Sequence, residues 1–177
     1  MNDSRTAASQ VTLRRWRHDD LAPLVRNADN RAIWRNMTDI FPHPYTVADG
    51  EEWIARCLVQ TPPRDLVIAV AGEFVGVCGF APGQGVQSNM GTVGYWVGEE
   101  HWGHGIATAA LAQFLTHVWG SFPVWRLEAR VFAWNPASAR VLEKNGFSLE
   151  RIRHSAIRKA GETTDELIFG LLRGKAT

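Results

Sequence analysis

The chain has 177 residues, of which 45% are hydrophobic and 21% are charged, and its net charge is +1. A chain of this length buries roughly 70% of the surface of its unfolded form, so one domain over 1–177 forms a core without disulfide or metal support. The near-neutral charge provides no cationic field that would attract nucleic acid or an anionic membrane, so neither partner is predicted.

Cysteine and histidine spacing predicts no metal site. Cys57 and Cys78 form no C-x-x-C pair, and no H-x-x-x-H pair occurs. Residues 1–10 are polar and lack the features of a signal peptide, and the apolar run at 66–71 is too short to span a bilayer. We therefore expect a cytoplasmic protein whose first ten residues form a flexible tail.

Strand and helix signals alternate along the chain, without a linker or repeat, and this alternation predicts a mixed α/β fold. The first part contains, in order, a strand at 11–17, a helix capped by Asp19, a helical piece through Ile33 and Trp34, an extended loop at 40–45 with Pro42 and Pro44, and a helix that begins at Thr46. Strands at 66–71 and 74–80, joined by a tight turn, form a hairpin that we expect at the centre of the sheet.

A glycine-rich loop at 82–91 and a strand at 92–98 open the second part. A long helix at 104–119 follows, and its apolar stripe consists of Ile106, Ala110, Leu111, Phe114, Leu115 and Val118. Then come a strand at 125–133, a helix capped by Asn135 that ends at Asn145-Gly146, and two strands at 147–158 and 164–172.

The most informative stretch is 94–108, where a strand passes through a glycine turn into a helix. Gly103 and Gly105 let main-chain N–H groups approach a pyrophosphate without a Cβ clash. The helix that follows directs its unpaired N–H groups and its positive dipole end at the same charge. The stretch therefore predicts a phosphate site, although such glycines also occur in plain strand-to-helix connections.

Trp102-Gly-His-Gly-Ile-Ala107 resembles the pyrophosphate motif of GNAT superfamily N-acetyltransferases, Gln/Arg-x-x-Gly-x-Gly/Ala, at all but its first position. A tryptophan at that position is familiar in RimJ/RimL-like members. Asn135-Pro-Ala-Ser138 and Asn145-Gly-Phe147 are similar to the Asn-x-x-Ser helix and the helix exit of the same family. The resemblance covers nearly the whole chain and points to the RimJ/RimL-like branch, the ribosomal-protein-alanine N-acetyltransferases.

That resemblance implies a GNAT fold, a mostly antiparallel twisted sheet of about seven strands with splayed fourth and fifth strands and about four flanking helices. It also implies acetyl-CoA as co-substrate and no metal. The pantetheine arm would pair with the fourth strand, where an N–H of Trp96 or Val97 would contact the thioester oxygen. The expected cofactor-binding residues are Tyr95, Trp96, Val97, Trp102, Gly103, His104, Gly105, Ile106, Ala107, Thr108, Asn135 and Ser138.

The implied reaction is attack of a neutral amine on the thioester, with expulsion of the CoA thiolate. Ser138 is the candidate general acid and Asn135 the candidate pantetheine contact, although a helix cap and an ordinary helix residue explain both types. The general base is unknown, because Thr92 and Ile157 stand where related enzymes often carry a carboxylate. The remaining candidates are Asp39, Glu99, Glu100, His101 and an ordered water.

Weak base assistance favours an acceptor that loses its proton easily. At pH 7, deprotonation costs about 1.4 kcal/mol for an α-amine and about 4.6 kcal/mol for a lysine amine. We therefore expect a protein or peptide N-terminus as acceptor, with a small-molecule amine such as an antibiotic or polyamine as the alternative. Aromatic residues at helical spacing are usually core, but four of them are candidates to line the acceptor pocket: Trp34, Phe41, Tyr45 and Trp53.

Two other classes of function remain open. The missing carboxylates are compatible with an acetyl-CoA-binding sensor that performs no turnover. A dinucleotide-binding oxidoreductase would use Gly103-His-Gly105 with Glu128, but Thr108 occupies the position of its third glycine or alanine. The chain is expected to be a monomer or a homodimer.

Overall fold

The computed structural model describes residues 8–174, and the chain divides into two compact units. Unit 1 contains the chain up to Gly79 together with Tyr95–Phe114, and unit 2 contains Phe80–Gly94 and the chain from Leu115. Of the predicted tail at 1–10, residues 1–7 lie outside the described residues, and 8–10 form a helical turn that leads into the first strand.

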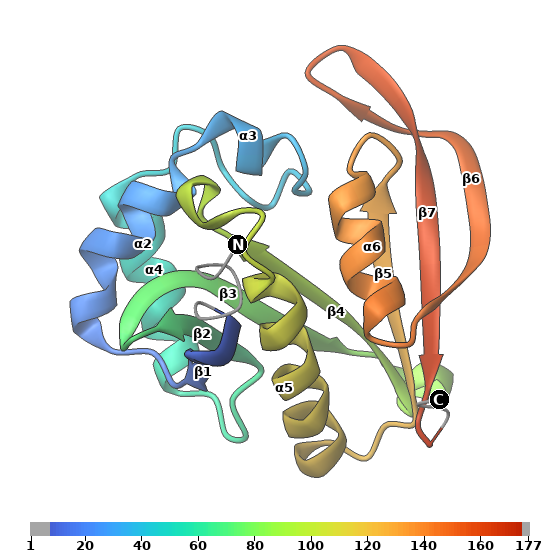
Figure 1. The fold of residues 1–177 in the computed structure, drawn as a ribbon, viewed down its shortest axis with the longest axis horizontal. Helices are drawn as coiled ribbons and strands as arrows, with labels where there is room; N and C mark the ends of the chain where they lie inside the picture. Colours follow the sequence, from blue (N-terminus) through green and yellow to red (C-terminus); the bar gives the residue numbers. More distant parts are fainter. Residues whose placement is uncertain (1–7, 175–177) are drawn as a thin grey trace. The chain divides into compact units, whose positions relative to one another are not determined.

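The predicted seven-stranded mixed sheet is confirmed, with the order β1-β2-β3-β4-β5-β7-β6 (Figure 1). Its strands are β1 (Val11–Arg14), β2 (Asp65–Val70), β3 (Glu73–Pro82), β4 (Met90–Val97), β5 (Arg126–Phe132), β6 (Ser148–Lys159) and β7 (Glu162–Leu172). The β1–β2, β2–β3, β5–β7 and β6–β7 pairs are antiparallel. β4 and β5 are parallel, and their ladder joins Met90–Thr92 to Arg126–Glu128.

The β2–β3 hairpin forms as predicted, but its expected place in the sheet is wrong. Ala71 and Gly72 both have positive φ, +51° and +89°, as a tight two-residue turn requires. The central strand is β4, the fourth of seven in the sheet order. A hairpin pattern shows which two strands are neighbours, but it contains no information on how many strands lie outside them.

Three helices belong to unit 1: α2 (Leu21–Ala28), α3 (Arg31–Trp34) and α4 (Val47–Leu58), with the 3-10 turn η1 (His18–Asp20) before them. Thr46 stands at the start of α4 as expected, and the structure adds that Thr46 and Asp49 form a capping box there. Asp19 does not cap α2, because it lies within η1 and the residue before the helix is Asp20. The Asp20 carboxylate instead accepts two hydrogen bonds from Arg14, at 2.6 and 2.8 Å.

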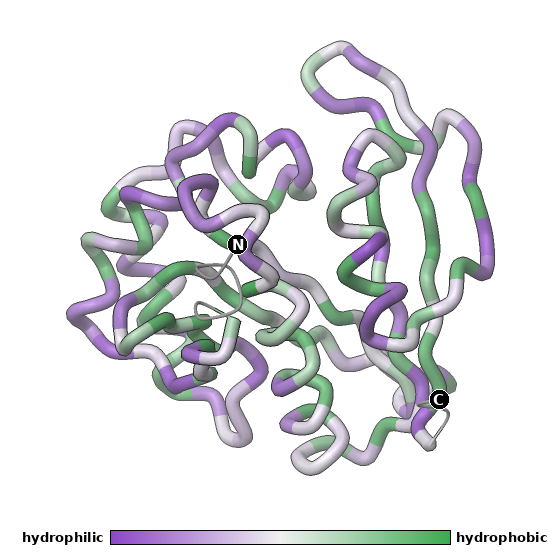
Figure 2. Tube along the Cα trace, viewed as in Figure 1, coloured by the Kyte–Doolittle hydropathy of each residue, from purple (hydrophilic) through white to green (hydrophobic). Residues whose placement is uncertain are grey.

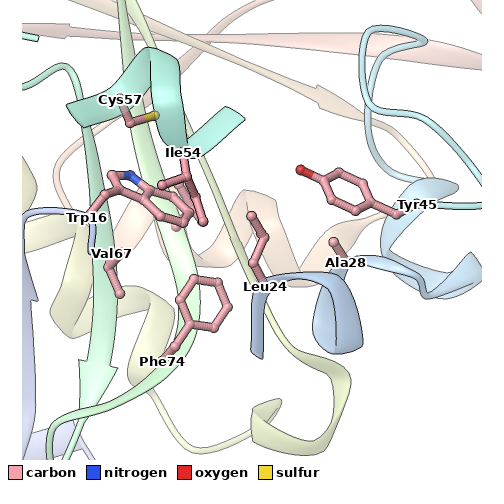
Figure 3. Packing of buried hydrophobic residues seen from close by; sticks show 9 residues of the cluster. Trp16, Leu24, Ala28, Tyr45, Ile54, Cys57, Val67 and Phe74 are labelled. Carbon is pink, nitrogen blue, oxygen red and sulfur yellow. The ribbon is translucent and has the colours of Figure 1, made fainter. Parts of the chain in front are cut away.

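Aromatic and aliphatic side chains from β2, β3, α2 and α4 form the core of unit 1 (Figure 3). Trp16 lies beneath Ile54 and Cys57 of α4, and its ring centroid is 5.8 Å from that of Phe74 on β3. α2 and α4 lie side by side over this cluster (Figure 1). Burial of this kind yields about 25 cal/mol per Å² of apolar surface, so the cluster fixes α2 and α4 to the strands.

Unit 2 contains β5, β7, β6, the 3-10 turn η2 (Gly85–Gln87) and α6 (Pro136–Lys144). Leu127, Ala129 and Val131 alternate as the buried face of β5, and Phe169 and Leu171 do so on β7. β6, at the end of the sheet order, is exposed along most of its length and largely hydrophilic (Figure 2).

The long helix α5 (Ile106–Ser121) begins two residues later than expected, because His104 belongs to the glycine turn. All six residues of its predicted apolar stripe are buried. In the described part of the chain, α2–α6 make five α-helices, one more than expected, since extended Asn30 separates α3 from α2. Over residues 8–174, no helix combines the length and apolarity needed to cross a bilayer.

Candidate active site

The glycine turn before α5 has the backbone conformation that its sequence predicts. Gly103 and Gly105 have φ of +80° and +74°, a region that costs a residue with a Cβ about 1–2 kcal/mol. A Cβ added to Gly103 would meet no atom within 4 Å, so the turn leaves open space beside its backbone. Ala109 N–H donates to Gly105 at 3.1 Å and closes the first turn of α5. The turn therefore presents open backbone at the start of a sixteen-residue helix, which fits a phosphate.

Trp102 connects this turn to β4. Its indole N–H donates to the carbonyl oxygen of Val97 at 2.7 Å, while the ring remains 45% exposed. The sequence placed Trp102 at the start of the motif but did not predict this bond. The only signal in the sequence was the residue type: tryptophan, with one N–H donor, occupies the position where the family usually has Gln or Arg. The bond joins the indole to the strand, five residues earlier in the chain.

The end of β4 is held against β3 in unit 1. A Cβ at Gly76 would overlap the carbonyl oxygen of Trp96, so the two strands approach as closely as only glycine permits. Gly98 N–H donates to the Val75 carbonyl at 2.8 Å. Val97 is buried, and the Trp96 ring packs on Phe74 with centroids 6.0 Å apart. These contacts fix the backbone at the end of β4. Contact of residues 95–97 with a thioester stays a prediction.

The aromatic loop between α3 and α4 reaches the same part of β4. Phe41 packs edge-on against Trp96, with centroids 5.9 Å apart, and lies 5.2 Å from the ring of Tyr45. Tyr45 is only 6% exposed and lies beside Leu24 and Ala28 in the core (Figure 3). Burial raises the pKa of its phenol to about 12. Trp34, the third predicted lining residue, packs on the imidazole of His43.

The carboxylates and imidazole expected near the end of β4 already have partners. Glu99 Oε2 accepts a hydrogen bond from Asn30 Nδ2 at 2.7 Å, which ties the 3-10 turn η3 (Glu99–His101) to the cap of α3. His101 Nε2 lies 3.4 Å from Glu100 Oε1. Asp39 lies on the exposed surface of the aromatic loop. Each remains a base candidate without a structural feature that distinguishes it.

In unit 2, Asn135 caps α6 as predicted. Its Oδ1 accepts the N–H of Ser138 at 3.2 Å, and Pro136 occupies the first turn. Ser138 is half-buried near the start of the helix. The cap alone explains the choice of Asn, so the predicted roles of both residues toward a cofactor stay predictions.

Thr92 pairs in the parallel ladder with Glu128, a carboxylate on the neighbouring strand. Glu128 accepts a hydrogen bond from Arg126 at 3.1 Å, and Arg126 also binds Glu150 of β6. Ile157 lies opposite Thr164 on β7. The carboxylate next to Thr92 is therefore part of an ion-pair network in unit 2.

Comparison with known proteins decides the family. The model of the acetyltransferase (GNAT) domain matches residues 10–148, well over half of the chain. The chain belongs to the GNAT acetyltransferase family. The resemblance seen in the Trp102–Ala107 and Asn135–Ser138 motifs is thus confirmed, and so is the GNAT fold.

Known members of the GNAT family show what this chain is similar to. The "uncharacterized N-acetyltransferase p20" of Bacillus licheniformis is 27% identical over 61% of the chain and 60% of the relative. RimJ of Mycobacterium smegmatis, solved with CoA-disulfide, has 28% identity and a TM-score of 0.79 over 92% of this chain and 81% of that one.

A spermidine N-acetyltransferase from Vibrio cholerae, solved with CoA and spermine, shares the fold at a TM-score of 0.80. It is 21% identical and covers 94% of this chain and 98% of that one. The sequence matches span 44–60% of the length of the curated relatives.

Proposed function

We propose that this GNAT chain is an acetyl-CoA-dependent N-acetyltransferase whose acceptor is a primary amine, most specifically the N-terminus of a protein or peptide. The observation that carries the proposal is the open, positive-φ turn at Gly103 and Gly105 before α5, in a chain of this family. Backbone N–H groups there, together with the helix dipole, would hold a pyrophosphate.

Other residues of the chain would bind the pantetheine arm, stabilise the thioester oxygen and protonate the leaving sulfur. The backbone of Tyr95, Trp96 and Val97 would hold the pantetheine arm, and a Trp96 or Val97 N–H would stabilise negative charge on the thioester oxygen. Asn135 would contact the pantetheine amides, and the Ser138 hydroxyl would give a proton to the departing sulfur. When bound, acetyl-CoA supplies an activated acetyl thioester.

A peptide N-terminus is the favoured acceptor because its amine binds a proton less tightly than a lysine amine does. The two positions where a carboxylate base is expected hold Thr92 and Ile157, and the free energy needed to deprotonate an α-amine at pH 7 is about 3 kcal/mol smaller than for lysine. Small-molecule amines are the second candidate class, supported by similarity in fold to the spermidine enzyme. A cytoplasmic location and a monomeric or homodimeric state belong to the same proposal.

The deciding experiment measures CoA-thiol release from acetyl-CoA with N-terminal peptides, free lysine, polyamines and aminoglycosides as acceptors. We expect release with the peptides, and a fall in kcat of about 10²-fold for Ser138→Ala if its hydroxyl is the general acid. Faster acetylation of lysine side chains than of α-amines would reject the acceptor class. Tight acetyl-CoA binding without release for any acceptor would instead favour a non-catalytic sensor.

A further inference from the structure

An imidazole–carboxylate pair lies at the aromatic loop and involves none of the base candidates named above. His43 Nδ1 lies 3.5 Å from Asp29 Oδ1, and the same oxygen accepts the Tyr45 N–H at 3.0 Å. The His43 ring also packs on the indole of Trp34, with centroids 5.3 Å apart and planes 31° from parallel. The His43 side chain is 30% exposed, so the ring is held by two neighbours and still meets solvent.

The loop that carries His43 contacts the end of β4 through Phe41. Phe41 stands two residues before His43 and packs on Trp96, the residue proposed to contact the thioester. Two residues of chain span at most ~7 Å, so the His43 backbone lies within that distance of Phe41. All of these residues belong to unit 1. Two of the four aromatic residues expected to line the acceptor pocket contact the His43–Asp29 pair directly, Trp34 through the imidazole ring and Tyr45 through its N–H. Phe41 is linked to the pair through the ring of Tyr45.

We propose that His43 is the general base of acetyl transfer and that Asp29 is its positioning residue. This assignment rests on the proposed N-acetyltransferase function. In this proposal the proton is on Nδ1, which faces Asp29 Oδ1 at 3.5 Å, and the Nε2 lone pair is left for the acceptor. Imidazole suits a base that works near neutral pH, and a partner carboxylate that fixes its orientation is a common arrangement.

The proton balance of the step is simple. Nε2 of neutral His43 takes one proton from the acceptor ammonium, and the resulting amine forms a C–N bond to the acetyl carbon. The C–S bond breaks, the Ser138 hydroxyl gives its proton to the sulfur as proposed above, and the second proton of the amine restores that hydroxyl. The products are the acetamide, CoA thiol and an imidazolium, which returns its proton to solvent.

Most other ionisable groups near this loop are less suited to the task, and one is a competing candidate. Tyr45 stays neutral at physiological pH, because burial raises its phenol pKa to about 12. Glu99 is engaged by Asn30. His101 lies 3.4 Å from Glu100 on η3, an arrangement like that of His43 and Asp29, so His101 is the competing candidate. Asp29 itself holds the Tyr45 backbone as well as the imidazole.

The test compares wild type with His43→Gln and His43→Asn, using an N-terminal peptide between pH 6.5 and 9.5. Asn keeps a donor toward Asp29 but cannot take a proton. We expect kcat/KM to fall by about 10²-fold or more at the low end of this range. The deficit should shrink above pH 8, where the α-amine, with a pKa of about 8, is already neutral. The Kd for acetyl-CoA and the Tm should stay unchanged.

Asp29→Asn retains the oxygen that accepts the Tyr45 N–H, and should give a smaller loss over the same pH range. His18→Gln, at an exposed position of η1, is the matched control, and His101→Gln tests the competing base. An equal loss at every pH would make His43 a structural residue, and unchanged kinetics would remove it from the reaction; either result overturns the assignment. An inactive wild type would defeat the proposed function itself, which is a separate result.

Discussion

The indole N–H of Trp102 donates to the carbonyl oxygen of Val97, so the turn before α5 is tied to the last residue of β4. Because both segments are proposed to contact one cofactor, this bond should set their spacing. Trp102→Phe keeps an aromatic ring and removes the donor, and a bond of this kind contributes about 1 kcal/mol. We expect the Kd for CoA, measured by calorimetry, to rise roughly five- to tenfold.

Trp125→Phe is the matched control, since Trp125 is 63% exposed and forms hydrogen bonds to Asn89 and Arg173 through its backbone. The Kd of the control should remain that of wild type. A Trp102→Phe protein with unchanged affinity would show that the turn keeps its position without the bond.

Gly103→Ala tests the positive φ of the turn. The added methyl group meets no neighbour, so its effect comes from the backbone, which must pay about 1–2 kcal/mol or change its conformation. CoA affinity should therefore fall by about tenfold. Gly120→Ala, also with open space around it and within α5, should leave affinity intact and stabilise the helix slightly. Equal affinities for the two variants would contradict a phosphate site at the turn.

Two substitutions at Asn135 separate its cap from its proposed contact with pantetheine. Asn135→Ala removes the oxygen that accepts the Ser138 N–H and should lower the free energy of unfolding by about 1 kcal/mol. Asn135→Asp keeps that oxygen and should retain the stability, measured by denaturant unfolding. If the side-chain amide donates to the cofactor, Asn135→Asp should still weaken CoA binding. Wild-type affinity in Asn135→Asp would leave Asn135 as a cap alone.

Both cysteines should be unreactive in the folded protein. Burial, aided by the Asp65 charge, raises the pKa of the Cys57 thiol to about 12, and burial also raises the pKa of Cys78. At pH 8 about one Cys57 thiol in 10⁴ is then ionised, and the thiolate is the reactive form. We expect a disulfide reagent to modify neither thiol until denaturant is added. Rapid modification of the native chain would contradict this, and would also interfere with the detection of released CoA thiol.

Local sequence signals predicted a large part of the fold. The glycine turn at Gly103 and Gly105, the helix start at Thr46 and the Asn135 cap were all predicted. Each depends on neighbours within four residues, so the sequence contains its cause. Asp19 failed as a cap for a tertiary reason, since the chain forms a 3-10 turn there and Asp20 binds Arg14.

The candidate site was predicted only in part. The bond from Trp102 to Val97 and the pairing of His43 with Asp29 depend on how the chain folds back, and no periodicity reveals them. His43 stood in the predicted loop between two prolines, where its residue type alone was the available signal.

The exposed outer strand β6 also bears on association between copies of the chain. A strand at the end of a sheet is a template for another strand, and natural sheets often oppose such pairing with charged side chains. β6 carries Arg151, Arg153 and Arg158 along its exposed length. A second β6 brought alongside it would have to accommodate these charged side chains, so we expect the strand to oppose edge-to-edge association of copies of the chain.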